Sequence, residues 1–214
     1  HQQGEVRPAT YAVFEQWIRG DFEKRGKSPR HLMGILKMII ETLGSQVTYS
    51  HLAHRMGEVT LPTFLDYCDH LERLDLVFSL QAFDQNRQIG FPKKARKFHF
   101  WDPFILDTVQ KWLAREGFLS QTIDDSLKAE SIVAAHFKSR MPTYYFKAKG
   151  EVDVVAVEKG RVRFVEVKWT SQLRPWNIAE LKKQKDAIIL TRQPAGGKVE
   201  GIPALFLPSF LVTS

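Results

Sequence analysis

One stretch, EVDVVAVEKGRVRFVEVKWT at residues 151–170, restricts the possible fold more than any other part of the chain. It predicts two apolar strands joined at Lys159-Gly160, because glycine supplies the positive φ that a two-residue hairpin turn needs. The two strands nevertheless carry charged residues, among them Asp153 and Glu166. Burying an unpaired charge is costly, so these side chains are expected to be paired or to hold a metal ion.

The turn also predicts the register of this hairpin. If residues 159–160 form the turn, counting outward places Asp153 opposite Glu166, with Cβ atoms roughly 5 Å apart on one face. Lys168 shares this face with Glu166, because side chains alternate along a strand. A divalent cation such as Mg²⁺, which binds oxygen ligands, would relieve the repulsion between the two carboxylates.

A third carboxylate belongs to the helix expected at 123–140. Glu130 lies within the apolar stripe of this helix, three residues after Leu127 and three before Val133. A glutamate in such a stripe usually pairs with a lysine or extends to the solvent. Because the helix directly precedes the hairpin, we expect Glu130 to point at the same site.

The first half of the chain has the pattern of a winged helix-turn-helix. Helical periodicity and caps predict four helices, at 9–19, from Ser28-Pro29 to Gly44, within 47–57 and ending at Gly57, and from Thr60 to Leu74. A strand at 76–83, a basic loop from Asp84 to Lys97 and a returning strand would form the wing, and a helix from Pro103 would follow. We therefore expect one domain at 1–116.

The second half has an α/β pattern, so the whole chain is expected to be a two-domain α+β or α/β protein. Helices are expected at 123–140 and 176–186, and strands at 144–147, 151–157, 162–169, 187–191 and 203–207. They would form a domain at 117–214 with a mixed sheet flanked by helices.

The order Glu130, Asp153 and Glu166-Val167-Lys168 resembles the core of the PD-(D/E)XK nucleases, in which a helix Glu precedes a strand Asp and an E-x-K. The family's proline is absent here, since Glu151-Val152 precedes Asp153. With the winged helix upstream, the chain resembles the C-terminal region of a prokaryotic, archaeal-type family of AAA+ ATPases.

The resemblance implies a restriction-endonuclease-like fold and metal-assisted hydrolysis of phosphodiesters in DNA. Asp153, Glu166 and the carbonyl of Val167 would hold Mg²⁺ or Mn²⁺, and Glu130 would bind through water or a second metal. Lys168 would orient the attacking water or help to deprotonate it. The resemblance equally admits a non-catalytic DNA-binding or protein-docking tail that regulates the ATPase.

The net charge of +7 favours an acidic partner such as nucleic acid. Backbone contacts are expected from a basic cluster in the wing, comprising Arg87, Lys93, Lys94, Arg96 and Lys97. Lys182 and Gln184 are further candidates, although a solvated basic face explains them equally well. Trp169 and Trp176 are expected in the core rather than stacked on bases. The helix expected from Thr60 to Leu74, which would be the recognition helix of a winged helix, has an acidic face with Asp66 and Asp69. This face favours docking on a protein over reading a DNA groove.

Other features limit the setting of the chain. A single cysteine, Cys68, permits no intrachain disulfide, so a reducing, cytoplasmic location is expected. Neither a membrane-spanning apolar run nor a signal peptide is evident. No GxxxxGK[ST] motif occurs, so this piece is not expected to hydrolyse ATP. The chain begins at His1 without methionine, and we expect it to be part of a longer protein whose ATPase domain lies upstream.

Overall fold

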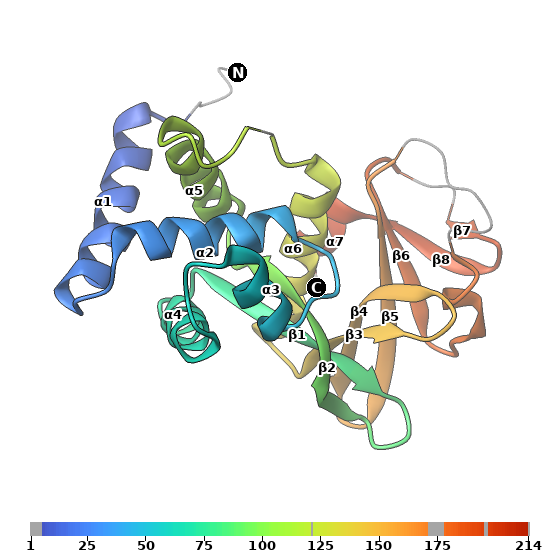
Figure 1. Cartoon of the computed structure of the whole chain (residues 1–214). Helices are drawn as coiled ribbons and strands as arrows, with labels where there is room; N and C mark the ends of the chain where they lie inside the picture. Colours follow the sequence, from blue (N-terminus) through green and yellow to red (C-terminus); the bar gives the residue numbers. More distant parts are fainter. Residues whose placement is uncertain (1–5, 121, 171–177, 195–196, 214) are drawn as a thin grey trace. The chain divides into compact units, whose positions relative to one another are not determined.

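The computed structural model describes residues 6–120, 122–170, 178–194 and 197–213. These residues form seven α-helices and one sheet of eight parallel and antiparallel strands, which makes the protein mixed α+β (Figure 1). The chain divides into two compact units. Unit 1 comprises His1–Leu43, Val47–Phe78 and Phe100–Ile123, and unit 2 comprises Gly44–Gln46, Ser79–His99 and Asp124–Ser214.

Unit 1 is helical, and its helices follow the predicted order. They are α1 (Pro8–Lys24), α2 (Pro29–Glu41), α3 (Tyr49–Met56), α4 (Leu61–Arg73) and α5 (Pro103–Arg115). Ser28, Thr48 and Thr60 cap α2, α3 and α4 by accepting hydrogen bonds from backbone N–H groups. The apolar stripe of α2 is fully buried, and this helix packs against the other four.

Helix α4 carries the predicted acidic residues on its exposed face. Asp66 and Asp69 are exposed, as expected. His70 of the same helix is buried, and its Nε2 lies 2.6 Å from Asp21 Oδ2. The helix turns this ring inward because Asp21 on α1 supplies a polar partner for it.

The sheet belongs to unit 2, except that Val77, Phe78 and Phe100 at the ends of its first two strands are in unit 1. Its strands are β1 (Val77–Asp84), β2 (Ile89–Phe100), β3 (Thr143–Lys147), β4 (Glu151–Glu158), β5 (Arg161–Lys168), β6 (Ala187–Thr191), β7 (Lys198–Val199) and β8 (Ile202–Phe206). Their order across the sheet is β2-β1-β3-β4-β5-β6-β8-β7. The helix α6 (Asp125–Lys138) packs on β3, β4 and β5, and α7 (Leu207–Thr213) packs on β6 and β8 (Figure 1).

The expected wing is the edge of this sheet. Residues 89–97, which we predicted to lie in a polar loop, belong to the long strand β2. β1 runs parallel to β3, with Ala82 beside Tyr145, so residues 79–99 belong to unit 2. The units therefore differ from the expected ranges 1–116 and 117–214, because β1 finds its hydrogen-bonding partner in the second half of the chain.

The hairpin of β4 and β5 has the predicted turn. Lys159 and Gly160 have φ values of 48° and 82°, the two positive angles of a tight two-residue turn. The ladder pairs Glu158 with Arg161 and continues to Val154 and Val165, as counted from the sequence. Asp153 and Glu166 are the next residues along the two strands.

Two predictions for the C-terminal region need correction. Within 178–186 the structure has a short 3-10 helix, Leu181–Lys183, and no α-helix. The rest of the helix expected at 176–186, including Trp176, lies outside the described residues. The structure also has two elements that we did not predict, β7 and α7.

Candidate functional site

At the end of the β4–β5 hairpin, Asp153 on β4 lies beside Glu166 and Val167 on β5. Asp153 Oδ2 accepts a hydrogen bond from the backbone N–H of Val167 at 2.9 Å. The register between β3 and β4 shifts here: Tyr144 lies opposite Val155, but Phe146 lies opposite Val152. Two steps on β3 therefore match three on β4, which places a bulge next to Asp153. Bulges redirect side chains and are frequent beside active sites.

Glu166 and Lys168 form an ion pair on β5. Lys168 Nζ lies 2.5 Å from Glu166 Oε1. Glu166 is only 5% exposed, and its second oxygen, Oε2, is buried with no hydrogen-bond partner among the described residues. The carboxylate of Glu166 is thus half satisfied by the protein, and one acceptor remains.

Glu130 also reaches this site, through a lysine that we assigned elsewhere. Lys97 Nζ lies 2.9 Å from Glu130 Oε1 and 3.8 Å from Asp153 Oδ1. The same ammonium forms an ion pair with Glu151, whose other oxygen accepts a hydrogen bond from the side chain of Gln46. Three carboxylates, from α6 and β4, thus surround one ammonium.

The prediction that Lys97 belongs to an exposed basic cluster is therefore wrong. Lys97 is 1% exposed, because the inner half of β2 lies in the core of unit 2. The sequence carried a signal for this position. Lys97 and His99 alternate with Phe98 and Phe100, which is the pattern of a strand with two buried faces. Glu151 carried a similar signal, because it is two residues before Asp153 on β4 and its side chain therefore points to the same face of the sheet.

Burial and mutual repulsion change the acidity of the two buried glutamates. Burial, followed by the charge of Asp153, raises the pKa of Glu130 to about 7 and that of Glu166 to about 8. Burial alone would lower the pKa of Lys97, but the charges of Glu130, Asp153 and Glu151 raise it above its ordinary value. The three carboxylates therefore keep the ammonium of Lys97 charged despite its burial.

Nearby, burial and the charge of Lys97 lower the pKa of His99 to about 3, so this ring is neutral. Its Nδ1 lies 3.2 Å from Ser131 Oγ on α6. His99 therefore adds no positive charge to the cluster.

The residues suit a divalent cation in their chemistry but not in their present spacing. All the candidate ligands are oxygens, which Mg²⁺ and Mn²⁺ prefer. The Oε2 of Glu166 is an acceptor that such an ion could use, and burial with the charge of Asp153 raises the pKa values of Glu130 and Glu166. Yet no group of three or more acidic, histidine or cysteine side chains in the described ranges is arranged to hold a metal. The ammonium of Lys97 lies between the carboxylates instead.

The remaining basic candidates are distributed over unit 2. Arg87, Lys93 and Lys94 are exposed at the outer end of the β1–β2 hairpin. Arg96 is half-buried and donates a hydrogen bond to Ser79 Oγ at 3.4 Å. Lys182 is exposed but lies 2.7 Å from Glu200 as an ion pair.

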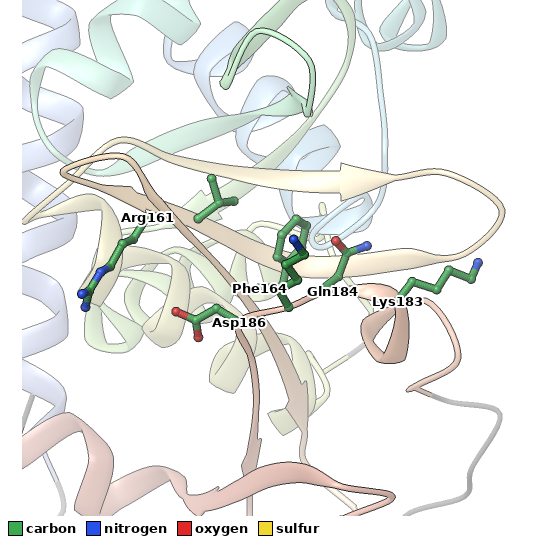
Figure 2. A pocket seen from close by; sticks show the side chains of 7 residues that line it. Arg161, Phe164, Lys183, Gln184 and Asp186 are labelled. Atoms are coloured by element: carbon green, nitrogen blue, oxygen red, sulfur yellow. The ribbon is translucent and has the colours of Figure 1, made fainter.

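Gln184 lines a separate hollow of about 600 Å³ between β5 and the segment before β6 (Figure 2). Its lining residues are Arg161, Val162, Phe164, Lys183, Gln184, Lys185 and Asp186. Lys183 is paired with Glu180 and Asp186 with Arg163. Arg161 and Lys185 carry the charges of this hollow that are available to an anionic ligand.

Fold and site together define a mixed α+β protein with a buried cluster of acids and lysines. Residues 2–116 match the family described as Domain of unknown function (DUF8612), and since this is more than half of the 214 residues, the chain belongs to that family. No curated protein and no solved structure matches the chain. The matched range includes Lys97 but none of the carboxylates around it. None of the described helices is long and apolar enough to cross a lipid bilayer.

Proposed function

We propose that this chain is a metal-dependent nuclease module that hydrolyses phosphodiesters in DNA. One observation carries the proposal: Glu130, Asp153, Glu166 and Lys168, separated by up to 38 residues, converge on one buried site. Structural ion pairs seldom gather four carboxylates around two lysines, because each buried charge costs free energy. Perturbed pKa values in such a cluster are typical of functional sites.

The order of elements supports a PD-(D/E)XK-like core. The helix α6 carries Glu130, β4 carries Asp153, and β5 carries Glu166 and Lys168, in the sequence helix, strand, strand, strand that this class uses. The upstream helices with the β1–β2 hairpin support the winged-helix interpretation, with the difference that the hairpin extends the sheet of unit 2. By the same resemblance, the partner of the module is an AAA+ ATPase domain.

The proposed roles follow from the contacts of each side chain. Asp153, Glu166 and the carbonyl of Val167 would hold Mg²⁺ or Mn²⁺, with Glu130 binding through water. The ion would lower the pKa of a bound water and stabilise charge on the phosphate. Lys168, beside Glu166, would orient this water. The exposed cations Arg87, Lys93 and Lys94, with Arg161 and Lys185 at the hollow, would bind the DNA backbone.

A cleavage assay tests this proposal. Supercoiled, branched and single-stranded DNA would be incubated with the protein and Mn²⁺, and Lys168→Ala is expected to lower the rate about 100-fold or more. Lys198→Ala, at an exposed lysine on β7, is the matched control and is expected to retain full activity. Equal rates for the two variants would show that the cleavage does not come from this site.

A second function is favoured by one observation. The exposed acidic residues of α4, Asp66 and Asp69, would be repelled by a DNA groove. A non-catalytic docking or DNA-binding tail that regulates an ATPase would leave all the DNA substrates uncut while still binding a protein partner or duplex DNA.

A further inference from the structure

Lys97 occupies the position in the carboxylate cluster that the proposed function assigns to a cation. Its side chain crosses from β2 to meet Glu130 on α6 and Glu151 and Asp153 on β4. It is the most completely buried lysine among the described residues, with 1% of its surface exposed. A lysine is buried at this depth only when several acceptors surround it.

The charges in the cluster do not balance when every group is ionised. The carboxylates are Glu130, Glu151, Asp153 and Glu166, and the ammonium groups are Lys97 and Lys168. When all six are ionised, four negative and two positive charges leave a net charge of −2. One divalent cation would neutralise this charge. However, each of the four carboxylates already has one oxygen directed at the ammonium of Lys97 or Lys168.

We propose that Lys97 is a built-in counter-ion of this site, and that a divalent cation binds only by displacing its ammonium from Glu130 and Asp153. The inference rests on the metal-dependent function proposed above. A divalent ion bound to the oxygens of Glu130 and Asp153 that face Lys97 would be repelled strongly by its ammonium, because like charges repel strongly where water is excluded. The four methylene groups of lysine allow the ammonium to withdraw while β2 keeps its place in the sheet.

Because of this displacement, a divalent cation enters the site only above a threshold concentration. A cation must compete with an ammonium that is permanently tethered beside its ligands, so the native protein should bind Mn²⁺ weakly. Lys97 is thus a positioning residue, which holds the carboxylates in their metal-free arrangement and sets the concentration at which metal enters.

Direct Mn²⁺ binding tests the proposal without measuring activity. Free Mn²⁺ would be followed by electron paramagnetic resonance during titration of the native protein and of Lys97→Met, which keeps the length of the side chain and removes the charge. We expect Lys97→Met to bind Mn²⁺ at least 10-fold more tightly. Lys147→Met removes an exposed lysine from β3, directly beside Glu151, and is expected to change the affinity less than 3-fold.

A second variant keeps the test decisive if Lys97→Met does not fold. Combining Lys97→Met with Glu151→Gln removes one charge of each sign, so the net charge of the cluster stays at −2 and Glu130, Asp153 and Glu166 remain. This double variant is also expected to bind Mn²⁺ more tightly than the native protein. Unchanged or weaker binding in the variant that folds would overturn the proposal.

The outcomes separate this inference from the proposed function. Tighter Mn²⁺ binding by the variants, with no DNA cleavage by the native protein, would retain Lys97 as counter-ion and remove the nuclease activity. Cleavage by the native protein, with the same Mn²⁺ affinity in all variants, would retain the nuclease and remove the role of Lys97.

Discussion

Glu166 and Lys97 lie in the same cluster, and burial disfavours the charge of both side chains, but the pKa of each responds differently to its neighbours. Burial raises the pKa of Glu166 to about 8, so this side chain is largely protonated at neutral pH. Burial opposes the charge of Lys97 as well, but three carboxylates more than reverse the effect on its pKa. At the residue scale the cluster therefore behaves as an acidic site that retains protons when metal is absent.

The stability of the metal-free protein should fall as the pH rises. The pKa of Glu166 is about 8 in the folded protein and near 4.5 when unfolded, so its stabilising effect is complete below pH 4.5 and is lost between pH 4.5 and 8. We expect the loss from this residue to reach a few kcal/mol at most, since one pKa unit corresponds to about 1.4 kcal/mol. Urea unfolding in EDTA across this pH range measures the effect.

The matched variant for this measurement is Glu166→Gln, which keeps the shape of the side chain and cannot ionise. Its stability should depend less on pH between 4.5 and 8 than that of the native protein. If the native protein and the variant show parallel pH dependences, Glu166 does not titrate in this range and the cluster holds its charge differently.

Replacement of Asp153 should distinguish the contribution of metal binding to stability from that of the fold itself. Asp153→Asn keeps an oxygen that can accept the hydrogen bond from Val167 N–H, but removes a negative charge from a cluster with excess negative charge. We expect a higher melting temperature in EDTA and a smaller rise on adding Mg²⁺, because a ligand that binds only the folded state stabilises it by mass action. An unchanged rise with Mg²⁺ would place the metal elsewhere.

At the scale of the elements, the turn between β4 and β5 supports the register of the whole site. Gly160 has a φ of 82°, and no atom lies within 4 Å of the position its Cβ would occupy. Gly160→Ala should therefore destabilise the protein by about 1–2 kcal/mol through backbone strain alone. The midpoint of urea unfolding measures this change.

Gly20 provides the comparison for this prediction. It lies within α1, also with open space around it, but without a positive φ. Gly20→Ala should stabilise the helix by up to about 1 kcal/mol. Opposite signs for the two variants would support the role of the turn, whereas two stabilising changes would mean that the turn tolerates side chains.

The β4–β5 hairpin was predictable because local rules determine it. Gly160 sets the turn, and the turn sets the pairing as far as Val154 and Val165. The bulge beside Asp153 was not predictable, because it depends on the register of β3, which joins β4 through a separate connection. Local pattern therefore predicted which side chains lie near one another, but not the distortion that aims them.

The partners of these side chains depended on long-range pairing. Lys97 is separated from Glu130 by 33 residues. Its sequence neighbours, Lys93, Lys94 and Arg96, form a basic run that indicated an exposed loop. Only the pairing of β1 with β3 brings β2 into the sheet and buries Lys97. Composition favoured the surface for this lysine, and tertiary structure decided otherwise.

For the whole molecule, the net charge of +7 predicts DNA binding through the phosphate backbone. Replacing Lys93 and Lys94 with Glu should weaken binding about equally on unrelated sequences and make it less sensitive to salt. Replacing Asp66 and Asp69 with Asn should leave binding unchanged or slightly stronger. Fluorescence anisotropy at several salt concentrations measures both effects.

The two outcomes assign different roles to α4. Loss of DNA binding in the Asp66 and Asp69 variant would make this helix a direct reader of DNA. No binding by the native protein at low salt would favour a protein-docking function for the region.

The crossing of Lys97 from β2 to the acids of α6 and β4 has a consequence for how such chains can diverge. The lysine lies inside the stretch shared with the family, and its three acidic partners lie downstream of it. A descendant that exchanged its C-terminal portion would keep the buried ammonium of Lys97 but lose the carboxylates that pair with it. Aligned relatives should therefore show the lysine and the acids changing together, and a recombinant that breaks this linkage should fold poorly until position 97 becomes apolar.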